Sequence, residues 1–78
     1  MKKEIKLAVL DFNSVTVNLY IISRIDQRRI SKKIGSKDQE EIVINFMEEQ
    51  GHKESECNYM YSENEISVYS EGEEIFEL

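Results

Sequence analysis

A chain of 78 residues with a formal net charge of −6 can form one domain, here residues 1–78, but is too short for two. Its 40 % hydrophobic content excludes a wholly disordered chain. The single cysteine, Cys57, excludes an internal disulfide or a zinc site built from several cysteines, and favours a cytoplasmic protein. No segment approaches the roughly 20 apolar residues of a spanning helix, so we expect no membrane contact.

The charge is unevenly distributed along the chain. Residues 1–37 hold nine Lys and Arg against three acids, whereas residues 38–78 hold thirteen acids against Lys53 alone. The two parts therefore carry formal charges of +6 and −12. Such asymmetry bears on partners and solubility and not on the fold.

Two strands open the chain. Residues 5–11 alternate, with Ile5, Leu7 and Val9 on one face, which is typical of a half-buried strand. Residues 12–14 have turn chemistry, and residues 15–22 are β-branched and aromatic with a second alternation. We expect residues 5–11 and 15–22 to form an antiparallel hairpin.

The apolar residues of segment 23–35 fit neither the two-residue period of a strand nor the 3.6-residue period of a helix well. The segment holds five of the ten basic residues. We predict a basic, flexible connection here, which either prolongs the second strand or forms a short helical turn.

The best-marked element is a helix from about Ser36 to Gln50. Ser36 and Gln39 have the spacing of a capping box, and Gly51 stands where a left-handed C-terminal residue is expected. One face of this helix is apolar and the other is acidic.

Short alternating segments complete the chain at residues 57–61, 66–69 and 74–78. The last is either a strand or a tail. The fold class predicted is therefore α+β, in two layers: an antiparallel sheet of four to five strands, in the order β-β-α-β-β with an optional extra β, is covered on one face by a single helix.

The basic segment is the first candidate binding surface. Arginine and lysine side chains can neutralise phosphates, and the candidates are Arg24, Arg28, Arg29, Lys32 and Lys33, within the segment 24–37. A solvated connection whose charges protect a sheet edge explains the same residues. The net negative charge weakens the case for nucleic acid.

A second candidate surface consists of tyrosines on the later strands, namely Tyr59, Tyr61 and Tyr69. If those strands pair, some of the rings stand on the sheet face away from the helix and offer a protein contact surface. The alternative is that they complete a thin core.

Catalytic and metal-binding motifs are weak. His52 is the only histidine, and Cys57 lies five residues later; we expect Cys57 to pack inward as a small apolar group. Asp11 opens a calcium-like pattern that lacks the required glycine and glutamate. We therefore predict no enzyme, no catalytic residues, no cofactor and no metal.

Several segments carry a resemblance. Residues 9–13, 17–20, 46–52 and 59–60 read VLDFN, VNLY, FMEEQGH and YM. This pattern resembles small, acidic, uncharacterised bacterial proteins of mobile genetic elements, over most of the chain except residues 23–35. The resemblance implies a bacterial, cytoplasmic, accessory protein and no catalytic activity.

The function predicted is that of a small non-enzymatic protein-interaction module of unknown partner. Exposed strand edges favour self-association, as a homodimer through a strand edge. The alternative is a nucleic-acid-linked role, either by direct binding through residues 24–37 or by acidic mimicry of DNA.

Overall fold

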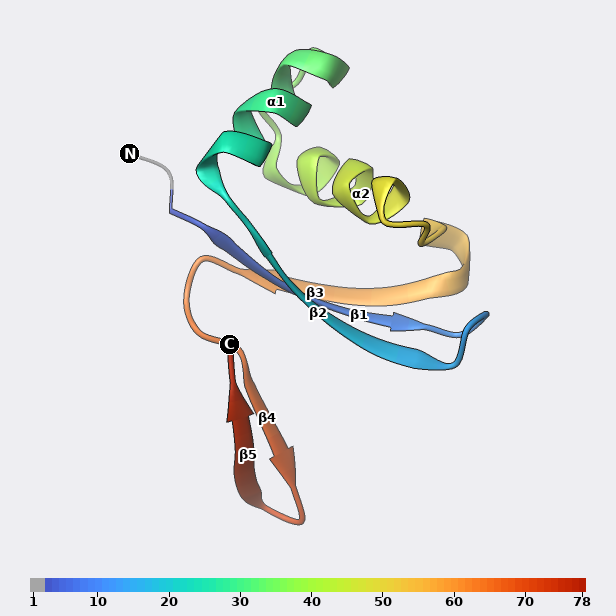
Figure 1. Ribbon diagram of the computed structural model, residues 1–78, viewed down its shortest axis with the longest axis vertical. Coiled ribbons are helices and arrows are strands. Elements are labelled where there is room, and N and C mark those ends of the chain that lie inside the picture. Colours follow the sequence, from blue (N-terminus) through green and yellow to red (C-terminus); the bar gives the residue numbers. More distant parts are fainter. Residues whose placement is uncertain (1–2) are drawn as a thin grey trace.

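The computed structural model describes residues 3–78, which form two antiparallel sheets and two helices. The elements follow in the order β1 (Ile5–Asp11), β2 (Thr16–Ile22), α1 (Arg24–Ile34), α2 (Gln39–Glu49), a 3-10 turn (Glu54–Glu56), β3 (Cys57–Ser62), β4 (Ser67–Ser70) and β5 (Glu73–Glu77). The α+β class predicted from the sequence is confirmed (Figure 1).

A three-stranded sheet has the order β2-β1-β3. β1 and β2 form the predicted antiparallel hairpin, with Leu7 opposite Tyr20 and Leu10 opposite Val17. β3 returns along the other edge of β1, which places Cys57 opposite Asp11. Both helices lie on one face of this sheet (Figure 1), so its two faces have different surroundings.

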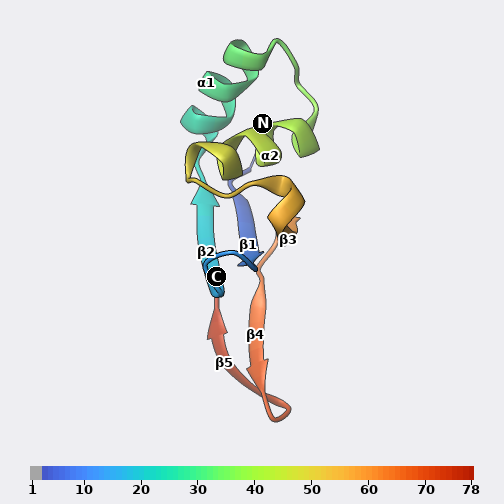
Figure 2. The same cartoon turned by 90° about the vertical axis from the view of Figure 1, so that its right-hand side faces the viewer.

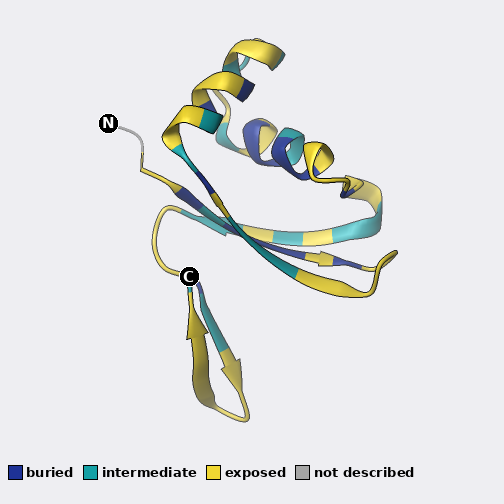
Figure 3. Ribbon diagram, viewed as in Figure 1, coloured by how far each residue is buried: buried dark blue, intermediate teal, exposed yellow. Residues whose placement is uncertain are grey.

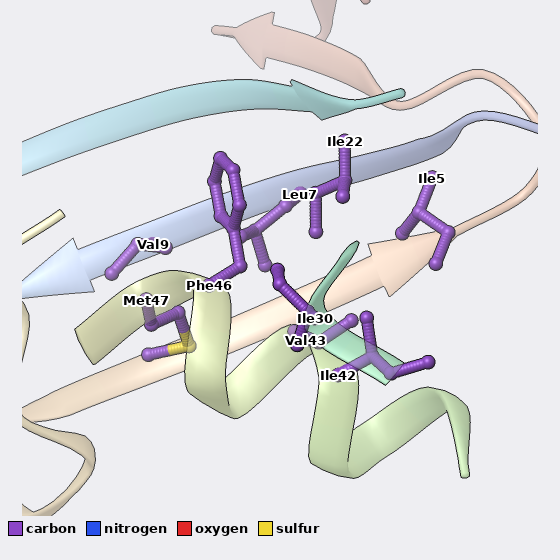
Figure 4. Close-up of a cluster of buried hydrophobic side chains, with 9 residues drawn as sticks. All are labelled: Ile5, Leu7, Val9, Ile22, Ile30, Ile42, Val43, Phe46 and Met47. Carbon is purple, nitrogen blue, oxygen red and sulfur yellow. The ribbon is translucent and has the colours of Figure 1, made fainter. Parts of the chain in front are cut away.

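The core lies between that face and the helices. Ile5, Leu7 and Val9 of β1 are fully buried there, as their alternation predicts. Figure 4 shows them beside the apolar face of α2 and Ile30 of α1; the remaining members are Ile22, Ile42, Val43, Phe46 and Met47. Burial of this cluster is the main source of stability in so small a chain.

The predicted helix of residues 36–50 is present as α2, but its N-terminal cap differs from the prediction. Asp38 is the cap, and its side chain accepts a hydrogen bond from the backbone N–H of Glu41. Ser36 instead accepts from the N–H of Asp38, outside the helix. Gly51 has φ +88°, the left-handed conformation predicted for it.

The expectation of a single helix is wrong, because residues 24–34 form α1 and not a flexible connection. Ser23 caps this helix by accepting a hydrogen bond from the backbone N–H of Asp26. At the other end, Gly35 is left-handed and its N–H donates to the carbonyl of Ser31. These two capping residues delimit a helix of 11 residues.

The predicted single sheet of four to five strands is not observed, because β4 and β5 pair only with each other. Glu71 and Gly72 both have positive φ, at 55° and 84°. This is the backbone of a tight two-residue hairpin turn. The β4–β5 hairpin, residues 66–78, is called the arm below, and it projects away from the sheet on the side opposite to the helices (Figures 1 and 2).

The molecule is consequently long and thin, with extents of 42 × 31 × 14 Å. Figure 3 shows buried residues concentrated between the helices and the sheet, whereas the arm is largely exposed. Ile66, at the base of the arm, is buried, but Tyr69, Ile75 and Phe76 are exposed. An isolated hairpin is marginally stable in water, so the arm carries apolar surface without an internal partner.

Candidate functional site

A buried hydrogen-bonded chain of polar side chains connects β1, β2 and the segment after α2. Nδ1 of His52 lies 2.6 Å from Oδ2 of Asp11, and Nε2 lies 2.7 Å from the hydroxyl oxygen of Tyr20. Asp11 and His52 are each only 7 % exposed. Asp11, Tyr20 and His52, together with Cys57, are called the polar cluster.

Local backbone geometry brings His52 into this position. The left-handed Gly51 turns the chain at the end of α2, and the N–H of His52 donates to the carbonyl of Met47 at 2.9 Å. The imidazole therefore points back over the sheet and packs against Tyr20, with the two ring planes at 64°.

Asp11 is the last residue of β1 and is held by the turn that follows it. Its Oδ1 accepts hydrogen bonds from the backbone N–H groups of Asn13 and Ser14, at 2.9 and 3.0 Å. One carboxylate oxygen is thus used by the turn. The other, Oδ2, faces His52.

The hydrogen bond from His52 and the backbone N–H of Ser14 lower the pKa of Asp11 to about 2. Asp11 is therefore an anion at neutral pH, and Nδ1–H of His52 is the donor to it. Burial and the Asp11 carboxylate raise the pKa of Tyr20. The phenol keeps its proton and can donate it to Nε2.

Cys57 completes the polar cluster because it begins β3 directly opposite Asp11. The ligating atoms of Asp11, His52 and Cys57 all lie within 4.8 Å of one another. Burial and the nearby Asp11 carboxylate raise the pKa of the Cys57 thiol. A nucleophilic cysteine needs the opposite shift, so this arrangement does not activate the thiol.

The predicted basic residues all lie on α1, where the structure divides them into two groups. Arg29 binds Glu49 of α2 through two hydrogen bonds of 2.8 and 2.9 Å, and Lys33 reaches the same carboxylate at 3.1 Å. Arg29 and Lys33 therefore join the two helices.

The other basic side chains of α1, together with Arg29 and Lys37, line a shallow depression of about 940 Å³, called the basic depression. Its lining residues are Arg24, Ile25, Arg28, Arg29, Ser31, Lys32 and Lys37. Arg24, Arg28 and Lys32 follow each other at four-residue spacing along one side of α1. Within residues 3–78, Arg28, Lys32 and Lys37 take part in no ion pair.

The three predicted tyrosines are not in one place. Tyr59 and Tyr61 of β3 are half-buried on the helix-covered face, with their rings stacked at 6.4 Å. The hydroxyl of Tyr59 donates to Glu40 of α2, and burial together with Glu40 raises the pKa of Tyr59 to about 12. Tyr69 lies on the arm and is exposed.

The face of the three-stranded sheet away from the helices is called the open face. The β1–β2 and β1–β3 registers assign to it Lys6, Ala8, Leu10, Val17, Leu19, Ile21, Asn58, Met60 and Ser62. Four of its large apolar side chains are exposed, between 41 % for Leu10 and 68 % for Val17. Lys6 is the single charged residue among these positions.

Asp11 was not among the predicted neighbours of His52 and Cys57. The signal was available in the alternation of β1, which puts Asp11 on the same face as Leu7 and Val9. A charged residue on a buried face needs a partner. The register of β3 against β1, which no local pattern predicts, identifies Cys57 as a neighbour.

Comparison with protein families, with curated proteins and with solved structures finds no match to this chain. Among residues 3–78, no helix has the length and apolar character needed to cross a membrane.

Proposed function

We propose that this chain is a small non-enzymatic protein-interaction module that binds a second copy of itself through the open face of its sheet. The observation that carries the proposal is the composition of that face. In a chain with 33 % charged residues, the open face presents exposed Leu10, Val17, Ile21 and Met60 with one lysine among them. Several exposed apolar side chains on one sheet face are typical of contact sites.

The charge distribution supports a second copy as the partner. The chain has a net charge of −6, so two copies repel each other over most of their surface. The open face has no acidic side chain at any of its positions. The strands of two open faces can therefore meet without carboxylates of their own between them. The acids on this side of the molecule lie on the arm, at Glu71, Glu73, Glu74 and Glu77.

The position of the arm supports the same partner. The arm stands on the side of the sheet that bears the open face (Figure 1), and it exposes Tyr69, Ile75 and Phe76. In an isologous contact between open faces both copies use the same surface, so each arm projects toward the side on which the other copy lies. Apolar side chains of the arm are then partly removed from water.

The size of the contact sets its expected strength. Strand spacing and rise give three strands of this length a footprint of roughly 350 Å². A standard interface buries about 800 Å² on each partner. We therefore expect a weak dimer that forms as the concentration increases. We place the protein in the cytoplasm of a bacterial cell, because a chain with one cysteine needs no disulfide.

Sedimentation equilibrium tests this proposal at chain concentrations from about 1 μM to about 1 mM, which spans association free energies from about −8 to −4 kcal/mol. We expect a monomer–dimer equilibrium in this range. Val17→Lys and Met60→Lys should shift it to monomer, while Ile25→Lys, an exposed apolar position on α1, should not. A strict monomer at about 1 mM contradicts the proposal.

The basic depression favours a second candidate function, binding of a nucleic-acid backbone. Three of its cations, Arg28, Lys32 and Lys37, are in no ion pair among residues 3–78. If they contact phosphates, the logarithm of the binding constant falls linearly with the logarithm of the salt concentration. Replacing Arg28 and Lys32 by Ser should reduce the size of this slope by roughly 0.9 per lost contact. Fluorescence anisotropy with duplex and single-stranded probes measures this, with Lys53→Ser as the control; absence of binding at low salt rejects it.

A further inference from the structure

We propose that Asp11, His52 and Cys57 form a binding site for one divalent metal ion of the zinc type. The ligating atoms are Oδ2 of Asp11, Nδ1 of His52 and Sγ of Cys57, which lie within 4.8 Å of one another. They come from the end of β1, the segment after α2 and the start of β3. The site lies at the helix-covered face, so it is independent of the contact proposed for the open face.

The distances suit a tetrahedral ion with modest adjustment. Zinc bonds of about 2.0–2.3 Å separate neighbouring ligand atoms by roughly 3.2–3.8 Å. The Nδ1–Oδ2 distance of 2.6 Å must lengthen, while the longest separation in the set must shorten by roughly 1 Å. Both changes require rotation of the Asp11 and Cys57 side chains.

The atoms that do not ligate are already held by other groups. Oδ1 of Asp11 accepts from the N–H groups of Asn13 and Ser14, and Nε2 of His52 faces the Tyr20 hydroxyl. A metal-bound histidine commonly donates its second N–H to such a partner. Because the Tyr20 oxygen both donates and accepts, the hydrogen bond persists when Nε2 becomes the donor.

The ligand chemistry selects the class of ion. One thiolate, one imidazole and one carboxylate suit Zn²⁺ or Co²⁺, whereas Mg²⁺ and Ca²⁺ prefer oxygen ligands alone. Cys57 is half-buried, so solvent can supply a fourth ligand. Binding moves the imidazole proton of His52 from Nδ1 to Nε2 by exchange with solvent and releases the thiol proton of Cys57 to solvent. The ion then connects β1, β3 and the end of α2.

Cobalt spectroscopy of the reduced, tag-free chain tests the site. We expect one Co²⁺ per chain, with the visible bands of tetrahedral cobalt and a near-ultraviolet thiolate-to-cobalt band, and displacement of Co²⁺ by Zn²⁺. Cys57→Ser should abolish the thiolate band. Glu63→Gln with Glu65→Gln, which removes exposed acids elsewhere, should leave both bands unchanged.

The Tyr20→Phe variant tests whether the hydrogen bond to Nε2 of His52 contributes to metal binding, or whether the three ligand side chains alone account for it. It keeps all three ligands but removes the partner of Nε2, so zinc affinity should fall roughly 10- to 100-fold while the thiolate band remains. Absence of a thiolate band in the folded wild-type chain overturns the proposal. Equal zinc affinity in the wild type and in Cys57→Ser also overturns it.

Discussion

The two faces of the three-stranded sheet are made by the same strands, yet they differ in what surrounds them. On the covered face, Leu7 and Val9 are fully buried beneath α2, and His52 is hydrogen-bonded to both Asp11 and Tyr20. On the open face, Leu10 and Val17 are exposed. One face therefore buries the core of the monomer, whereas the other leaves apolar side chains exposed.

The largest expected effect comes from a matched pair of leucines on β1. Leu7→Ala removes a fully buried side chain and should lower the free energy of unfolding by about 2–5 kcal/mol. Leu10→Ala, on the open face, should change it by less than about 0.5 kcal/mol in dilute monomer. Urea unfolding monitored by circular dichroism measures both.

Similar losses for the two leucine variants, measured where the chain is monomeric, contradict the assignment of separate roles to the two faces. The outcome depends on concentration, because dimer formation would bury Leu10.

A matched pair of tyrosines tests the polar cluster. Tyr20→Phe leaves Nε2 of His52 without its partner and should cost about 1–3 kcal/mol of stability. Tyr69→Phe, on the exposed arm, should have an effect below about 0.5 kcal/mol. Thermal unfolding of the metal-free proteins gives the comparison, and equal melting temperatures would show that the cluster does not stabilise the fold.

Acid should weaken the contact between α1 and α2. The hydrogen bonds from Arg29 lower the pKa of Glu49 from 4.5 to about 2. Because the folded-state pKa is the lower one, this contribution is complete above about pH 4.5 and is lost as the pH falls toward 2. Unfolding measured between these values should show a shallower decline for Glu49→Gln than for the wild type.

The control for this pH dependence is Glu48→Gln, at the adjacent exposed position on α2. It should leave the decline unchanged. An identical decline in Glu49→Gln and the wild type would mean that the ion pair with Arg29 adds no stability.

Alternation and helical periodicity predicted the elements that bury apolar side chains. The β1–β2 hairpin and α2 follow from residues 5–22 and 39–49, where burial enforces the pattern. The missed helix, α1, buries only Gln27 and Ile30. Gln27 interrupts the apolar stripe of this helix. It can be buried because its side chain donates to the carbonyls of Lys3 and Ile22, and no local pattern predicts these tertiary contacts.

The candidate sites were predictable to different extents. The basic residues of α1 were identified from the sequence. Which of them are used in ion pairs was not, because Arg29 and Lys33 pair with Glu49 of the other helix. The polar cluster depends on register, because Asp11 meets Cys57 only through the pairing of β1 with β3. The separation of the arm is likewise a matter of pairing, because β4 and β5 pair only with each other, while the positive φ at Glu71 and Gly72 makes the turn between them.

We propose the open face as the contact surface between two copies. Isotope-filtered NMR on a mixture of labelled and unlabelled chains tests it most directly, because it detects only contacts between copies. We predict intermolecular signals among the methyl groups of Leu10, Val17, Ile21 and Met60. Their absence at concentrations where dimer is present, or signals confined to the helices, would contradict the claim.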